Sequence, residues 1–143
     1  DITINNSNTA SGSDGSTGIT LISGNNTWAA ILFGDSDDDD VGSIKYSNIG
    51  NFLRFTTAGA TRMELNSDGD MIPEVDGSQD LGSSSKRWQD VYTSDLDLSN
   101  ETKGGNTIDG TWGSYKIEEG ENDLFLINRR NNKRYKFNLT EVD

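Results

Sequence analysis

Turn-forming residues recur about every ten positions in the first half of the chain, and this spacing limits the elements between them to short strands. The turns are rich in Gly, Asn and Asp, which accept the backbone angles that tight turns require. Between the turns, residues alternate with the period of two that is typical of a strand. The sequence therefore predicts an all-β meander, sandwich or fibre, with strands at residues 19–22, 28–33, 41–46, 52–57 and 61–66.

Apolar residues are scarce for a chain of this length. Leu, Ile, Val and Phe together make up 30 of the 143 residues, which is just above the level at which a chain is expected to be disordered. A single copy would therefore bury only a thin core. Two outcomes stay open: partial disorder, or an interior that several copies of the chain share. The patterned strands that follow residue 18 favour the shared interior.

The charge and the missing residue types argue against several classes of function. The formal net charge is −12, and nucleic-acid recognition needs basic patches, so we expect no nucleic-acid partner. The chain has no Cys and no His, which removes the thiol nucleophile, the usual general base and the commonest metal ligand. No apolar run approaches the roughly 18 residues of a membrane span. We expect no membrane insertion, no cofactor and no catalytic residue.

The sequence divides into five consecutive segments. They are a flexible leader (1–17), strand repeats (18–72), a turn with a short helix (73–100), a linker (101–111) and a C-terminal tail (112–143).

The third segment carries three bulky side chains at helical spacing. Trp88, Val91 and Tyr92 are placed at i, i+3 and i+4, so they share one face if this short stretch is a helical turn. Large apolar side chains on so short an element need another element to cover them. We therefore expect Trp88, Val91 and Tyr92 to be part of a core.

The tail has the pattern of a three-stranded antiparallel meander. Tyr115 and Ile117 indicate the first strand, residues 123–129 a second strand buried on both faces, and residues 133–139 a third. The Asn131-Asn132 pair favours a hairpin turn, because Asn tolerates left-handed backbone angles. Three strands alone are marginally stable, so we expect other copies to cover the core residues of the tail: Leu124, Phe125, Tyr135 and Phe137.

An ordered set of motifs resembles the shaft of phage tail fibres and tailspikes. The motifs are Gly42-Ser43-Ile44-Lys45-Tyr46, Leu53-Arg54-Phe55-Thr56-Thr57-Ala58-Gly59, Arg62-Met63-Glu64-Leu65-Asn66-Ser67-Asp68-Gly69 and the segment from Asp80 to Tyr92. The resemblance covers roughly residues 18–100. In that family a cleavable intramolecular chaperone domain often follows the Trp-containing segment. Here the sequence continues as a linker and a compact tail, so we do not expect self-cleavage.

The resemblance implies an assembly and a role. Proteins of this family are intertwined homotrimeric fibres of short strands, with a β-shaft or β-prism architecture. By resemblance, this chain would join two identical chains, lie extracellularly in the virion tail, and attach to a glycan or another receptor on the host surface. The tail would form a small antiparallel β tip. Its mechanism would be multivalent adhesion by weak sites that act together.

A run of acidic residues at 35–40 is the weak candidate for a metal site. Asp35, Asp37 and Asp39 offer carboxylates, the ligands that suit Ca²⁺. The run does not match an EF-hand, which needs Gly at its sixth position and Glu at its twelfth. A solvated acidic turn is the favoured interpretation, and we expect no metal.

The basic turn of the tail is the candidate for host binding. Its cations are Arg129, Arg130, Lys133, Arg134 and Lys136, and the first four are the predicted host-binding cations. Two nearby aromatic residues, Trp112 and Tyr115, could stack on sugar rings. For the cations the favoured alternative is ion pairing between chains with the acidic residues Glu118, Glu119, Glu121 and Asp123. For the aromatic residues it is a place in the core.

Three other functions stay open beside the virion fibre. They are a trimeric bacterial surface adhesin, a tailspike that degrades polysaccharide, and a trimerisation tip without a receptor. Degradation would require a pair of suitably placed carboxylates. The acidic residue considered for this role is Glu64, which lies between Met63 and Leu65, and strand alternation points it away from them.

Overall fold

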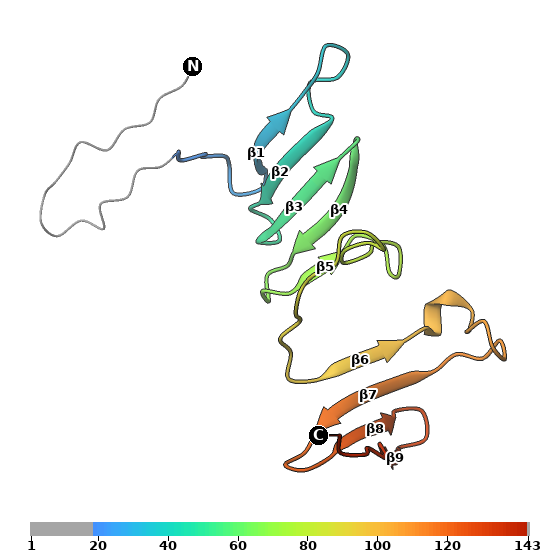
Figure 1. Ribbon diagram of the computed structural model, residues 1–143. Helices are drawn as coiled ribbons and strands as arrows, with labels where there is room; N and C mark the ends of the chain where they lie inside the picture. Colours follow the sequence, from blue (N-terminus) through green and yellow to red (C-terminus); the bar gives the residue numbers. More distant parts are fainter. Residues whose placement is uncertain (1–18, 143) are drawn as a thin grey trace, which may run out of the picture. The chain divides into compact units, whose positions relative to one another are not determined.

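The computed structural model describes residues 19–142, so the predicted leader lies outside the described residues. Within this part of the chain the regular elements are strands and one 3-10 turn, η1 (Glu101–Lys103), and the fold is all-β as predicted. The chain divides after Val75 into two units, and each unit contains one antiparallel sheet (Figure 1). No helix in the described residues is long and apolar enough to cross a membrane.

The first sheet is a meander in which each strand pairs with the next one along the chain. In order across the sheet, its strands are β1 (Trp28–Phe33), β2 (Gly42–Ser47), β3 (Phe52–Thr57), β4 (Ala60–Leu65) and β5 (Met71–Pro73). The predictions for β1 to β4 are confirmed to within one residue. The strand predicted at residues 19–22 is wrong, because this stretch forms no ladder with a described strand. β5 was not predicted.

A two-residue turn joins β3 to β4. Ala58 and Gly59 have φ values of 51° and 68°, and two positive φ values in succession define the type I′ turn, whose twist matches that of the strands it joins. The ladder between these two strands also contains a register shift between Phe55 and Thr56. The turn fixes which residues of β3 and β4 share a face.

The two faces of the first sheet differ in chemistry. The strand register places on one face, which we call the apolar face, Ala29, Ile31, Phe33, Ile44, Tyr46, Leu53, Phe55, Met63, Leu65 and Met71. The opposite, mixed face carries Trp28, Ala30, Leu32, Ser43, Lys45, Ser47, Phe52, Arg54, Thr56 and Glu64. The charged side chains Lys45, Arg54 and Glu64 therefore share the mixed face, because neighbours across the ladder lie on the same side of the sheet.

The second sheet has four strands. They are β6 (Leu96–Ser99), β7 (Ser114–Glu119), β8 (Leu124–Asn128) and β9 (Lys133–Lys136), paired in this order. The three predicted strands of the tail are confirmed as β7 to β9, although the third is shorter than predicted. Asn132 has a φ of 58° in the β8–β9 connection, as expected for the Asn pair. β6 was not predicted. It pairs with β7 on the side opposite to β8.

The second sheet also has one face that is mainly apolar. That face carries Leu96, Leu98, Tyr115, Ile117, Leu124, Leu126 and Tyr135. The opposite face carries Phe125 and Ile127 among the charged residues Asp97, Lys116, Glu118, Arg134 and Lys136. β8 is only half-buried on both faces within one chain, so the full burial predicted for it is not reached.

The predicted helical turn around Trp88 is absent. Residues 80–95 form bends and irregular backbone, and Trp88, Val91 and Tyr92 are exposed, Trp88 at 64%. A single helical turn fixes several backbone angles for one hydrogen bond, so it forms only where packing supports it. Among the described residues no element covers these three side chains, and the predicted helix is wrong.

The segment predicted as a linker is held by local hydrogen bonds. It contains η1 and a loop in which the backbone N–H of Asn106 donates to the carbonyl of Thr111 (2.8 Å). The carboxylate of Asp109 accepts bonds from the backbone N–H of Thr111 (2.9 Å) and from its hydroxyl (2.7 Å). These bonds favour the charged carboxylate and lower the pKa of Asp109.

Neither unit has an apolar core of its own. Among the described residues no apolar side chain is fully buried, and the two buried residues are Ser43 and Ser47. Taken by itself and within the described residues, each sheet is a single layer. Neither unit therefore covers the apolar face of its own sheet.

We predict that Ala58→Val destabilises the first sheet. A β-branched residue is strongly disfavoured at positive φ, so the free energy of unfolding should fall by about 1–2 kcal/mol in urea denaturation. Ala60→Val is the matched control, because Ala60 begins β4, where β-branched residues are favoured. An equal loss in both variants would contradict the turn geometry.

Candidate functional site

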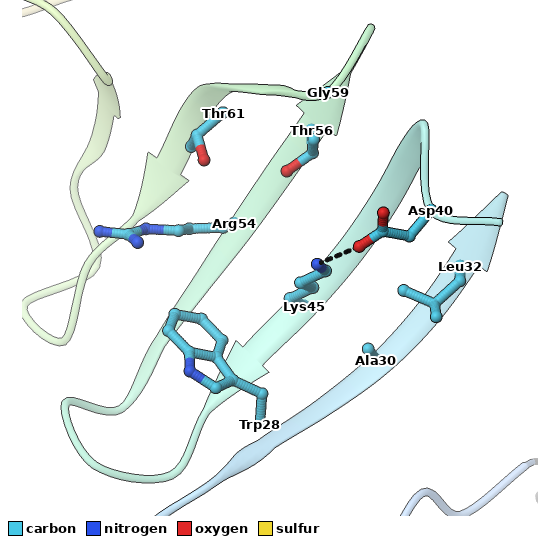
Figure 2. Close-up of a pocket in the computed structure, with 9 residues that line it drawn as sticks. All are labelled: Trp28, Ala30, Leu32, Asp40, Lys45, Arg54, Thr56, Gly59 and Thr61. Atoms are coloured by element: carbon cyan, nitrogen blue, oxygen red, sulfur yellow. Dashed lines mark hydrogen bonds and ion pairs between the residues drawn. The ribbon is translucent and has the colours of Figure 1, made fainter. Parts of the chain in front are cut away.

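A groove on the mixed face of the first sheet is the candidate functional site. It crosses β1 to β4 and has a volume of about 480 Å³, within the range of small-molecule sites. Figure 2 shows the residues that line it: Trp28, Ala30, Leu32, Asp40, Lys45, Arg54, Thr56, Gly59 and Thr61. The groove therefore combines one aromatic ring with charged and hydroxyl groups, which suits recognition of a polar ligand.

Trp28 is held in place by its neighbours on the same face. Its ring meets that of Phe52 edge to face, with 5.3 Å between centroids and 76° between planes. The guanidinium of Arg54 lies over both rings, 5.5 Å from the centroid of Trp28 and 4.8 Å from that of Phe52. Such contacts are each worth about 0.5–1.5 kcal/mol. The indole is 39% exposed, so an oriented aromatic surface stays open to solvent.

Two ion pairs balance the charge of the groove. Arg54 Nε donates to Glu64 Oε2 at 3.0 Å, and Lys45 Nζ donates to Asp40 Oδ2 at 3.2 Å. Glu64 points to the mixed face, as its position in the strand predicts. Each cation has a carboxylate partner, so the groove offers hydrogen-bonding groups without excess charge.

The acidic run at 35–40 is a turn held by its own side chains. Asp35 Oδ1 accepts the backbone N–H groups of Asp37 (2.9 Å) and Asp38 (3.0 Å). The carboxylates that lie within 4.8 Å of one another are those of Asp38, Asp39 and Asp40, all exposed. Of the predicted candidates only Asp39 belongs to this group. These three carboxylates are solvent-exposed, and Asp35 holds the backbone of the turn.

The cations of the basic turn differ in their partners. Arg129 pairs with Asp97 of β6 at 3.1 Å, and Lys136 pairs with Asp123 at 2.7 Å. In the part of the chain that the structure describes, Lys133 and Arg134 form no ion pair. The pairing expected with the acidic residues before β8 occurs within the chain at Asp123.

A second cation–carboxylate cluster lies on the charged face of the second sheet. Lys116 Nζ bonds Glu118 at 2.7 Å and Asp95 at 2.9 Å. The bonds to Glu118 and then Asp95 favour the ammonium form and raise the pKa of Lys116. Glu118 therefore pairs with Lys116 of its own strand, β7, and not with a cation of the basic turn.

The two aromatic residues of the predicted host-binding set already have partners. The guanidinium of Arg130 lies 3.9 Å from the ring centroid of Trp112, and its Nη1 donates to the carbonyl of Trp112 at 2.8 Å. The hydroxyl of Tyr115 accepts a bond from Asn128 Nδ2 at 3.0 Å, and its ring lies on the apolar face. Arg130 therefore occupies one face of the Trp112 ring.

Comparisons with family models, with curated proteins and with solved structures found no match. The resemblance to tail fibres therefore stays a prediction.

Sequence reasoning missed the Trp28 groove. Trp28, Lys45 and Arg54 lie on three different strands and are distant in sequence, whereas the basic turn is contiguous. The available signal was cross-strand alternation. Pairing β1, β2 and β3 as successive hairpins places these three side chains on one face.

We predict that Arg130→Ala lowers the free energy of unfolding by about 1 kcal/mol, because it removes the stacking on Trp112 and a charge-assisted hydrogen bond. Urea denaturation measures the change. Arg134→Ala is the control, since Arg134 is exposed on the edge strand β9, and its loss should stay below about 0.5 kcal/mol. An equal loss of stability in both variants would contradict a stabilising role for the contact between Arg130 and Trp112.

Proposed function

We propose that this chain is a segment of a phage tail fibre or spike whose copies assemble into a homotrimer that attaches to the host cell surface. The observation that carries the proposal is the absence of a fully buried apolar side chain among the described residues, beside an uncovered apolar face on each sheet. The role in the virion rests on the motif resemblance.

The apolar faces support self-assembly. Burying apolar surface stabilises by about 25 cal/mol per Å², and a face left in water contributes nothing. Soluble monomers rarely expose large contiguous apolar patches. Because the ten side chains of the apolar face of the first sheet recur in every copy, copies can cover one another by symmetry.

The open sheet edges support the same arrangement. β1 and β5 are the edges of the first sheet, and β6 and β9 those of the second. Exposed edges are templates for further pairing, and proteins cover or block them. In an intertwined fibre, neighbouring copies cover both edges and faces. The number three comes from the resemblance, since two copies would also cover a face.

Attachment then depends on the faces that assembly leaves open. The mixed face of the first sheet carries Lys45, Arg54 and Glu64, whose burial without water would be costly. We place it outward, so each trimer presents three equivalent surfaces. No catalytic step is part of the proposal.

We predict a solution mass of about 47 kDa, three times the 15.6 kDa of one chain, by light scattering. A mass near that of one chain would contradict the burial of apolar faces between copies. A dimer would be consistent with that burial but would contradict the trimeric fibre.

A matched pair in β1 tests which face is covered. Ile31 and Leu32 are adjacent and exposed to a similar extent in one chain, 47% and 50%, but lie on opposite faces. Ile31→Asp should dissociate the assembly, because it places a charge in the interface, and Leu32→Asp should leave the mass unchanged. The reverse result would place the mixed face inside.

We also predict multivalent attachment to cells. Labelled protein should sediment with at least one strain in a panel of bacteria, and Ile31→Asp, once monomeric, should bind at least 100-fold more weakly, since linked weak sites gain about 10²–10⁴ in avidity. The control is Arg87→Ala, because Arg87 is exposed in an irregular segment and belongs to neither the mixed face nor the basic turn. A trimer that binds no strain would contradict the attachment role but not the structural role.

A further inference from the structure

We infer that the Trp28 groove binds a neutral, hydroxyl-rich saccharide. The inference rests on the attachment role proposed above, and it assigns that role to the first sheet instead of the basic turn of the tail.

The groove provides the apolar surface that a sugar ring needs. A pyranose presents an apolar face of C–H groups and a rim of hydroxyls, and aromatic rings are the usual partners of such amphipathic surfaces. Trp28 is 39% exposed at the groove, and its orientation is fixed by Phe52 and Arg54. A ring oriented before binding loses little entropy on contact. Trp112 is less exposed than Trp28, and Arg130 lies closer to its ring (3.9 Å) than Arg54 lies to the ring of Trp28 (5.5 Å).

The polar groups around Trp28 match a rim of hydroxyls. Thr56 and Thr61 are cross-strand neighbours whose side chains line the groove (Figure 2). Within the described residues, their hydroxyls form no hydrogen bond. Lys45 and Asp40 bond each other at 3.2 Å and keep further donor and acceptor positions free. Together they offer both donors and acceptors, as sugar hydroxyls require.

The charges favour a neutral ligand over an anionic one. Both cations that line the groove are paired with carboxylates, Arg54 with Glu64 and Lys45 with Asp40. An anion would have to displace these partners. The chain also carries a net charge of −12, which repels polyanions at long range. A sulfated or uronic-acid polymer is therefore disfavoured.

Isothermal titration of the full chain with defined oligosaccharides tests the inference. The probes are neutral hexasaccharides of glucose, mannose, galactose and N-acetylglucosamine, with oligogalacturonate and a heparin hexasaccharide as anionic comparisons. We expect binding to at least one neutral probe and weaker binding to both anionic ones. Binding of the anionic probes alone, or of none, would overturn the inference.

Two matched tryptophan variants locate the site. Trp28→Ala should weaken binding of the neutral probe at least tenfold, and Trp112→Ala should leave it within twofold. The opposite pattern would move the site to the tail and overturn the inference. Because Trp28 also packs on Phe52, the variant must first show the wild-type mass and urea midpoint.

A second variant keeps the test decisive if Trp28→Ala does not fold. Thr56→Val with Thr61→Val removes two hydroxyls and retains the shape of both side chains, and it should weaken binding about threefold to tenfold. Unchanged binding in this double variant, with the neutral probe still bound by wild type, would overturn the groove as the site. A trimer that binds cells but no neutral probe would refute this inference alone, whereas a monomer that binds neither would refute the proposed function.

Discussion

Each sheet of this protein satisfies its backbone but leaves its apolar side chains uncovered. Successive antiparallel strands pair the interior backbone groups, so no long-range crossover is needed. The same meander has no second layer, and among the described residues no apolar side chain is fully buried. Stability depends on hydrophobic burial more than on backbone pairing. The missing burial is therefore the constraint that any functional account must meet.

Strand alternation gives the two faces of the first sheet different side chains, so covering each face has a different energetic cost. Ile31, Ile44 and Phe55 pair across three strands on the apolar face, whereas Lys45 and Arg54 pair on the mixed face. Covering the mixed face would strip water from two ion pairs, and covering the apolar face costs no such desolvation. In the proposed assembly, this difference would place other copies on the apolar face and leave the mixed face for a ligand.

Local signals made β1 to β4 predictable. Turn residues and period-two alternation act over a few positions, and β1 and β3 have the predicted bounds. β5 has three residues and ends in Pro73, and β6 is recognisable only through its pairing with β7, so neither leaves a local signal. The spacing around Trp88 was helical, yet a spacing creates no helix without a surface to pack on.

The groove illustrates why sites on sheets are harder to find than sites on turns. A basic turn is visible because its cations are neighbours in sequence, whereas Trp28, Lys45 and Arg54 meet only through the register of two hairpins. Because the side-chain period is two, a slip of one residue would turn Lys45 to the other face and dissolve the cluster. The register that gathers the apolar residues on one face is thus the same register that assembles the groove on the other. Selection for a shared interior would preserve the groove geometry at no additional structural cost.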